Sequence, residues 1–344
     1  MWKLTGMMLL FLLLTAVVVQ AQSEDCPSIV EEALAPLGDL CNPLDRNSAC
    51  YGARTVESTT FVEPRPASFF DAPGERSELA QLREIHPQPL DEDTRSFGVA
   101  ALNVQANVPN TLPGQSVLFL LMGDARLTNE VSQNSSRETP FQSFYFLPGV
   151  GQSNCYEADP MLTIQTPGNI AVTITLNGVE TEMSPGTLLT ITPSVCTIHR
   201  GNIIQRAGDE TAVLLANQTV DIRIEETGRI VVTNLRGISE REYERGLQIQ
   251  EAVNALAKAN GWPEQIITPP TAFDEEPTSA QASCEVQHTI LIGETLHQIA
   301  RRYDTSLPGI VEANQIANPR LIYAGQTLCI PNPGSGFEPL PAGQ

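Results

Sequence analysis

Hydrophobic and polar residues alternate through the middle of the chain, residues 97–236, as expected for β-strands. Val99 to Val108 gathers apolar side chains on one face, and Ser116 to Met122 is a continuous apolar run suited to full burial. Asn177-Gly178 predicts a two-residue hairpin, because both positions of that turn need positive φ. Further turns recur at spacings typical of an all-β sandwich or barrel, in one domain or two. They are Pro185-Gly186, Arg200-Gly201, Gly208-Asp209 and Thr227-Gly228.

The N-terminal region, residues 22–96, has a different pattern. Ser28 to Leu40 carries apolar residues at helical spacing, with Ser28 and Glu31 placed as a capping box. A proline-containing loop follows, and a second short helix is expected near Ser77 to Ile85. We expect this region to be partly helical and to pack on the β-rich body.

A second helical pattern, within residues 237–262, follows the strands. Ser239 and Glu242 form a predicted capping box, and Gly261 is a predicted C-terminal cap. Its apolar face predicts docking on the sheet. Residues 263–283, acidic and proline-containing, are expected to form a flexible linker, and the tail 332–344, rich in Gly and Pro, is expected to be disordered.

The segment between linker and tail, residues 284–331, is a compact unit of its own. An alternating run from Glu285 to Ile292 predicts a strand, and Thr295 with Gln298 three residues later predicts the start of a helix. Asp304-Thr305-Ser306 should end that helix and allow a second short one. Thr327 to Ile330 then predicts a closing strand, so the expected order is strand, helix, helix, strand.

The residues of this unit resemble the LysM family. The matching positions are Gly293-Glu294-Thr295-Leu296, Ile299-Ala300 with Tyr303, Asn314, Asn318-Pro319-x-Leu321-Ile322-Tyr323 and Gly325-Gln326-x-Leu328-x-Ile330-Pro331. The resemblance implies a small α+β domain of βααβ order that binds N-acetylglucosamine polymers, either peptidoglycan or chitin. The expected fold class is therefore multidomain, with a mainly β body, peripheral helices and this C-terminal domain.

In LysM domains the glycan lies between the loop after the first strand and the loop before the second. The resemblance therefore assigns glycan binding to Gly293, Glu294, Thr295, Leu296, Pro319, Leu321, Ile322, Tyr323, Ala324 and Gly325. Glycine allows close backbone approach, and amides and apolar side chains suit a neutral sugar, so we expect no metal and no cofactor. Several of the apolar residues, Leu296 and Leu321 among them, could equally be core.

The N-terminus carries the pattern of a signal peptide, residues 1–21. Lys3 precedes an apolar run from Met7 to Val19, and Val19-Gln20-Ala21 places small residues at the cleavage offsets. We therefore expect a secreted, cell-wall-associated protein with no membrane attachment after cleavage. The chain has 40 acidic and 20 basic residues, a formal charge of -20, which argues against nucleic acid or anionic lipid as partners.

Seven cysteines suit an oxidising compartment. Cys284 and Cys329 bracket the LysM-like unit, and a disulfide closing a loop of roughly 45 residues would stabilise it by about 4 kcal/mol. For the other cysteines, we expect Cys26 or Cys41 to pair locally and Cys50 to reach another segment or stay free. The remaining two, Cys155 and Cys196, flank strands. The sequence does not determine the connectivity.

No catalytic motif stands out in the body. Only His86 and His199 lie outside the LysM-like unit, without metal-ligand spacing, and Lys3 and Lys258 are the only lysines. We therefore expect a non-catalytic wall-binding protein whose body has an unknown partner. One alternative is a glycan hydrolase, which needs only two carboxylates. Another is a soluble chitin-binding protein, for which Asn134 and Asn217 could be glycosylated.

Overall fold

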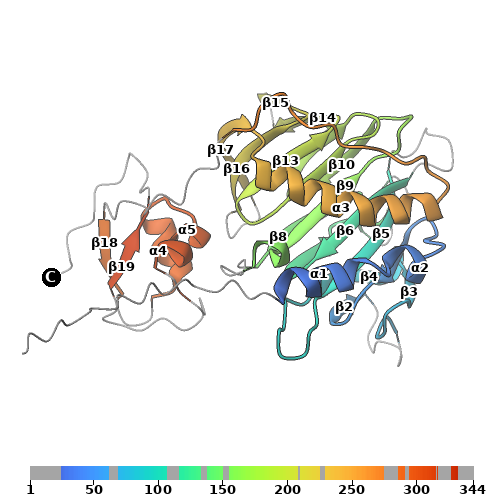
Figure 1. The fold of residues 1–344 in the computed structure, drawn as a ribbon, viewed down its shortest axis with the longest axis horizontal. Helices are drawn as coiled ribbons and strands as arrows, with labels where there is room; N and C mark the ends of the chain where they lie inside the picture. Colours follow the sequence, from blue (N-terminus) through green and yellow to red (C-terminus); the bar gives the residue numbers. More distant parts are fainter. Residues whose placement is uncertain are drawn as a thin grey trace, which may run out of the picture.

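Two β-sheets packed face to face form the body of the protein, and a smaller α+β unit follows them in the chain (Figure 1). The computed structural model describes residues 25–61, 69–106, 116–132, 138–149, 155–207, 210–224, 229–274, 286–290, 294–314, 316 and 327–331. The predicted signal peptide and the predicted tail lie outside these residues. No helix in the described part of the chain is both long and apolar enough to cross a bilayer.

The first sheet has nine described strands in the order β17-β16-β13-β12-β9-β6-β5-β1-β3. Their bounds are β1 Ser48–Tyr51, β3 Arg76–Glu78, β5 Val99–Gln105, β6 Ser116–Met122, β9 Met161–Gln165, β12 Leu188–Ile191, β13 Val195–Arg200, β16 Gln218–Ile224 and β17 Ile230–Gly237. Every neighbouring pair in this sheet is antiparallel.

The second sheet has eight described strands in the order β15-β14-β11-β10-β8-β7-β4-β2. Their bounds are β2 Val56–Thr60, β4 Leu82–Pro87, β7 Ala125–Asn129, β8 Ser143–Pro148, β10 Val172–Leu176, β11 Val179–Met183, β14 Asn202–Ala207 and β15 Glu210–Leu215. Only β8 and β10 pair in parallel. From β4 onward the chain crosses back and forth between the two sheets, and each new strand is added beside the previous strand of its sheet. The strands of each sheet therefore lie in the order in which they occur in the sequence.

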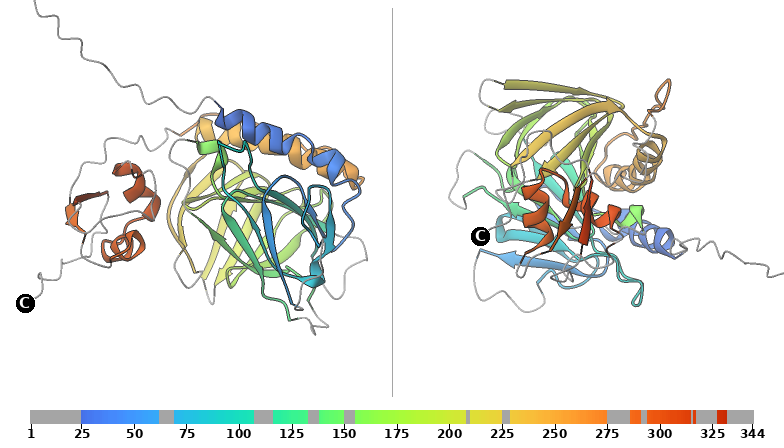
Figure 2. Two further views of the ribbon diagram at one scale, coloured as in Figure 1. Left: turned by 90° about the horizontal axis from the view of Figure 1, so that it is seen from below. Right: turned by 90° about the vertical axis from the view of Figure 1, so that its left-hand side faces the viewer.

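The main core lies between the two sheets. Phe119 of β6 and Phe144 of β8 meet across it edge to face, with ring centroids 5.1 Å apart. A second apolar layer lies on the outer face of the nine-stranded sheet, under α1 Cys26–Leu34, α2 Leu37–Leu40 and α3 Glu240–Ala259 (Figure 2). Because β5 and β6 are covered on both faces, their residues are buried on both.

The strand, hairpin and helix predictions for the centre of the chain are confirmed. β6 has the predicted bounds, and Asn177 and Gly178 join β10 to β11 with φ of 49° and 78°. Ser239 and Glu242 form the predicted capping box of α3, and Gly261 follows with φ of 74°. The strand predicted from Val99 ends at Gln105, and it is buried on both faces instead of one.

Two predictions for the N-terminal region are wrong. The first helix begins at Cys26, is interrupted at Ala35-Pro36, and lacks the Ser28–Glu31 capping box, because the Ser28 hydroxyl donates to the Asp25 carbonyl at 2.7 Å. The segment from Ser77 to Ile85 forms part of β3, a 3-10 turn η1 at Leu79–Gln81, and most of β4. Pairing with β1 and β2 outweighs the local preference for helix there.

The boundaries between the predicted domains also differ from the structure. Strands β1 to β4 belong to the same two sheets as the later strands, so the region from residue 25 to 96 is part of the body. Residues 263–274, predicted as linker, lie along α3. Asn254 exchanges side-chain hydrogen bonds with the backbone of Gln265, and the Gly237 amide donates to Asp274 at 2.7 Å. The rest of the predicted linker, 275–283, lies outside the described residues.

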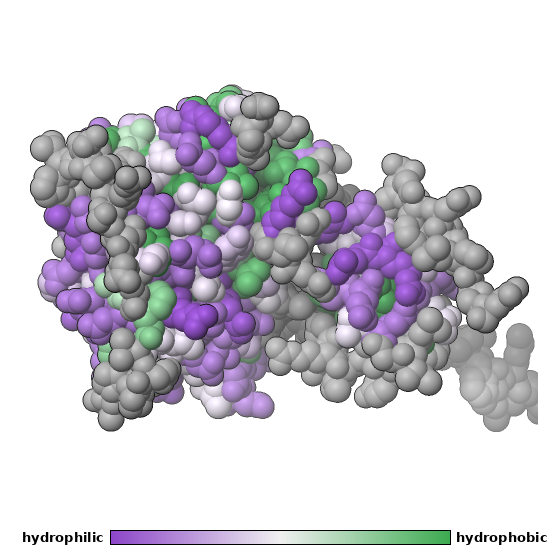
Figure 3. Space-filling view, turned by 180° about the vertical axis from the view of Figure 1, so that it is seen from behind, coloured by the Kyte–Doolittle hydropathy of each residue, from purple (hydrophilic) through white to green (hydrophobic). Residues whose placement is uncertain are grey.

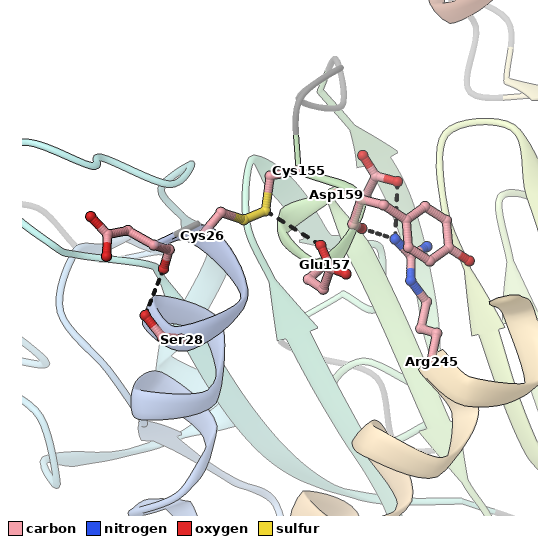
Figure 4. The surroundings of a disulfide bond; sticks show 8 residues. Cys26, Ser28, Cys155, Glu157, Asp159 and Arg245 are labelled. Atoms are coloured by element: carbon pink, nitrogen blue, oxygen red, sulfur yellow. Dashed lines mark hydrogen bonds and ion pairs between the residues drawn. A yellow bond between two sulfur atoms is a disulfide. The ribbon is translucent and has the colours of Figure 1, made fainter. Parts of the chain in front are cut away.

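Two disulfides are present in the body, between Cys26 and Cys155 and between Cys41 and Cys50. The local partner of Cys41 is Cys50, so the expectation that Cys50 would reach a distant segment or stay free is wrong. The distant bond ties α1 to the 3-10 turn η2, Tyr156–Ala158 (Figure 4). Arg245 of α3 holds the same turn through the Tyr156 carbonyl and Asp159.

Candidate glycan-binding site

The C-terminal unit has the predicted order of elements. β18 Val286–Thr289 pairs with β19 Thr327–Ile330, and α4 Leu296–Arg302 and α5 Leu307–Ala313 lie between them in the chain. The pairing is antiparallel, with His288 opposite Leu328. The second strand has the predicted bounds, and the first is shorter than the predicted run from Glu285 to Ile292.

A small apolar core holds these elements together. Its buried members come from both helices, the strands and the segments beside them: Ile290, Leu296, Ile299, Ala300, Ile310, Val311, Ile316, Leu328 and Ile330. A core of this size supplies only a few kcal/mol, so the polar contacts around it contribute a large share of the stability.

Side-chain caps position the two helices. The Thr295 hydroxyl accepts from the Gln298 amide at 3.3 Å, and the Gln298 side chain accepts from the Thr295 amide at 3.0 Å. This is the predicted capping box. The Ser306 hydroxyl accepts from the Gly309 amide at 3.0 Å in the first turn of α5. Thr295, one of the predicted glycan-site residues, is thereby held at the start of α4.

A polar cluster around the buried His288 lies beside α4. His288 contacts the Glu294 carboxylate at 2.8 Å through Nε2 and the Tyr303 hydroxyl at 3.0 Å through Nδ1. Arg302 pairs with the other carboxylate oxygen at 2.5 Å. Sequence reasoning missed this cluster. The signal for it was a polar His288 on the inward face of the first strand, with Tyr303 among the matched positions.

Asn314 ties α5 to the second strand. Its side-chain amide donates to the Ile310 carbonyl at 2.8 Å and to the Cys329 carbonyl at 2.6 Å, while its oxygen accepts from the Cys329 amide at 2.6 Å. The Thr305 hydroxyl donates to the Pro331 carbonyl at 2.6 Å. These contacts give a structural reason for the family match at Asn314.

Three of the ten predicted glycan-binding residues are described. The Leu296 side chain belongs to the core, the Thr295 hydroxyl caps α4, and the Glu294 carboxylate faces His288 and Arg302. The other seven lie outside the described residues: Gly293, Pro319, Leu321, Ile322, Tyr323, Ala324 and Gly325. The predicted Cys284–Cys329 bond also involves an undescribed residue, Cys284.

The two histidines of the body lie in different sheets. His86 of β4 contacts the Asp124 carboxylate at 2.8 Å and the Gln88 amide at 3.3 Å. His199 of β13 is buried beneath α3, with the Thr190 hydroxyl at 3.0 Å. Burial raises the pKa of the Cys196 thiol to about 12. A thiol with that pKa remains protonated at neutral pH and is a poor nucleophile.

Two strands, two helices and their shared core define a small α+β module in the last fifth of the chain. This module is a LysM domain, because the LysM domain family model matches residues 288–331. A LysM domain implies binding to polymers that contain N-acetylglucosamine.

Two relatives match this chain over a segment. The secreted LysM effector ECP6 of Passalora fulva is 37% identical over 54 residues, which cover 16% of this chain and 24% of the relative. The protein named probable autolysin SsaALP, of Staphylococcus aureus strain NCTC 8325 / PS 47, is 35% identical over 98 residues, 28% of this chain and 37% of the relative. The matched part therefore spans about a quarter to a third of these relatives.

Two crystal structures of proteins provisionally assigned as anti-sigma factors, from Parabacteroides distasonis ATCC 8503, align with this chain. The alignments cover 51% and 40% of this chain, at 9% and 10% identity, with TM-scores of 0.27 and 0.23. The same alignments cover 74% and 60% of the chains in the two crystal structures. TM-scores this low support no conclusion about the fold or function of the body.

Proposed function

We propose that this protein is a secreted, non-catalytic carbohydrate-binding protein whose LysM domain attaches the β-rich body to peptidoglycan in a cell wall. The observation that carries the proposal is the LysM match at residues 288–331, on a unit that folds with the LysM order of elements.

The charge around the described half of the site supports an uncharged ligand. Glu294 is the only carboxylate among the ten predicted residues, and it is paired with Arg302 and held by His288. Pairing removes the carboxylate from the surface offered to the sugar. Backbone groups of the segment around Glu294 can form hydrogen bonds with an acetamido group.

The placement of the reactive side chains supports a non-catalytic body. His86 and His199 lie in different sheets, and Cys196 is buried. A second candidate function is nevertheless favoured by one observation. The similarity to the relative named probable autolysin SsaALP extends over 98 residues. This is more than the 44 positions, from 288 to 331, that match the LysM family. That candidate is a cell-wall glycan hydrolase.

A pull-down on insoluble peptidoglycan and on insoluble chitin tests the proposal. The mature chain, residues 22–344, is compared with a matched chain ending at Ser283, which keeps the body and its disulfides. We expect the full chain to be retained, more on peptidoglycan than on chitin, and the shorter chain to be washed out. Equal retention of both chains would rule out the LysM domain as the wall-binding part. Stronger retention on chitin would favour the soluble chitin-binding alternative.

A separate assay tests the absence of catalysis. Purified residues 22–283 and the full chain are incubated with isolated peptidoglycan, and new reducing ends and soluble fragments are measured against a known wall hydrolase. We expect no release above buffer. Release by either chain, lost on heat denaturation, would establish the hydrolase alternative.

A further inference from the structure

The two sheets of the body do not end together. The nine-stranded sheet ends at β17 and the eight-stranded sheet ends at β15. β15 connects to β16 through residues 216 and 217 alone, so β15 lies across from β16 in the other sheet. Among the strands that the structure describes, none lies across from β17. The last strand of the larger sheet therefore overhangs the smaller one.

The overhang leaves apolar side chains uncovered. In the strand register, Val232 is opposite Ile222 and Leu235 is opposite Val220, so all four share the core-facing side of the sheet. Ile222 and Val220 are 5% and 1% exposed, whereas Val232 and Leu235 are 49% and 53% exposed. The change occurs within a single strand spacing. The core-facing side of β17 is suited to covering by one more strand added beside β15.

The edge strand β15 is also apolar. Leu214 faces the core and is 6% exposed, whereas Val213 and Leu215 lie on the outer face of the eight-stranded sheet and are about half exposed. Hydrophobic surface gathers toward this end of the body in the view from behind (Figure 3). The opposite end of the sandwich is protected against pairing with another strand by short strands and charged side chains. There β3 has only three residues, with Arg76 and Glu78 exposed, and β2 carries the exposed Glu57. Short strands and charged side chains prevent pairing at a sheet edge. β15 and β17 are longer than β3, and they expose apolar side chains instead.

We propose that a second copy of this chain covers this end, with β17 of each copy adding to β15 of the other. β15 and β17 run in the same direction, because the chain reverses once between each of them and β16. A two-fold axis parallel to the strands then places the overhang of each copy in the open position of its partner. The nine-stranded sheet of one copy continues into the eight-stranded sheet of the other, and the contact closes on itself.

The second copy suits the position better than an undescribed segment of the same chain. The position needs an extended strand with apolar residues on one side, and β17 is such a strand, eight residues long. The undescribed segments 275–283 and 332–344 contain Pro277, Pro333, Pro339 and Pro341. Proline lacks the amide that a strand within a sheet must donate.

The size of the contact fits a dimer of moderate affinity. A strand of eight residues is about 26 Å long. The stepped contact crosses two sheet edges, each about 10 Å deep, and a step about 5 Å wide between them, so it covers roughly 600 Å² on each copy. The total, about 1,200 Å², lies at the lower end of the range for specific interfaces. Such a dimer would carry two LysM domains, and two linked sites bind a polymer more durably than one.

Analytical ultracentrifugation of the mature chain, residues 22–344, over micromolar concentrations tests the proposal. We expect a reversible monomer–dimer equilibrium. The paired substitution Val232→Lys and Leu235→Lys should raise the dissociation constant at least tenfold, with the circular dichroism spectrum unchanged because both positions are half exposed. The matched control is Thr59→Lys on β2, at the opposite edge of the smaller sheet, which should leave the equilibrium unchanged.

Cross-linking identifies the contact independently of these charged variants. With Val232→Cys, a short bismaleimide should link two copies, and with Thr59→Cys it should not. A chain that stays monomeric at all concentrations would overturn the proposal. So would a dimer that Val232→Lys and Leu235→Lys leave intact, or a monomer whose β15 amides are protected from hydrogen exchange by another segment. Wall binding through the LysM domain is measured separately and does not depend on the outcome.

Discussion

At the scale of single residues, His199 is a buried polar side chain of the body, and Asn314 is a partly buried one of the LysM domain. In the body, burial lowers the pKa of His199 to about 4, below its ordinary value of 6.5, so the ring under α3 is uncharged at neutral pH. In the LysM domain, Asn314 joins α5 to β19 through three hydrogen bonds. A role for Asn314 could be predicted only through the family match. No structural role could be predicted for His199, because the helix that covers it, α3, is distant in the chain.

The His199 ring should make the body sensitive to acid. Because the folded state holds a lower pKa, the unfolded chain binds the proton first as pH falls below 6.5. The free energy of unfolding should therefore drop by up to about 3 kcal/mol between pH 6.5 and pH 4. Urea unfolding of the wild type and of His199→Gln across this range measures it. We expect a shallower pH dependence in the variant, and equal slopes would contradict the account.

Asn314→Ala should loosen the LysM domain without affecting the body. The substitution leaves the partly buried amide and carbonyl of Cys329 without their side-chain partner, at a cost of about 1–3 kcal/mol. We expect hydrogen exchange of the Cys329 amide to accelerate by roughly 10- to 100-fold. Amides of β6 provide the internal control. Unchanged exchange at Cys329 would show that the Asn314 bridge contributes little.

At the scale of elements, local signals predicted α3, the Asn177-Gly178 hairpin and both LysM helices, because caps and turns involve residues within a few positions. The same reasoning failed where distant pairing decides. Leu79, Leu82 and Ile85 recur every three residues, as on a helix, yet they lie in η1 and β4 between paired strands. Their burial in the main core outweighs the local pattern.

The contact between α3 and β13 provides a test at this scale. A Cβ at Gly246 would overlap the His199 ring. Although alanine favours helix over glycine by about 1 kcal/mol, Gly246→Ala should lower stability by about 1–2 kcal/mol through overpacking. In a His199→Ala background the same change should be neutral or stabilising. Thermal unfolding of the four proteins gives the coupling, and equal effects of Gly246→Ala in both backgrounds would refute the contact.

The two disulfides of the body should differ in their contributions. The Cys26–Cys155 bond spans 129 residues and the Cys41–Cys50 bond spans 9. In the chain-entropy model these correspond to about 5 and about 2.6 kcal/mol. Denaturant unfolding of Cys26→Ser with Cys155→Ser, compared with Cys41→Ser with Cys50→Ser, should show the larger loss for the first pair. The reverse order would indicate that native contacts, and not loop length, dominate.

At the scale of the whole molecule, the LysM domain could be predicted from the sequence because its fold and its family pattern lie within one short segment. The body could be predicted only as mainly β. Which strands share a sheet depends on pairings such as β1 with β5, whose residues are about 50 positions apart. The predicted boundaries at residues 96 and 262 fell inside the body for the same reason. All ten glycan-binding residues, from Gly293 to Gly325, remain predictions.

We propose that the LysM domain holds this protein on a polymer containing N-acetylglucosamine. The most direct test of this attachment is competition for the full mature chain bound to insoluble peptidoglycan. Soluble N-acetylglucosamine oligomers should release the protein in a concentration-dependent way, whereas glucose oligomers of the same length, which lack the acetamido group, should not. Retention that neither oligomer affects, or equal release by both, would contradict the account.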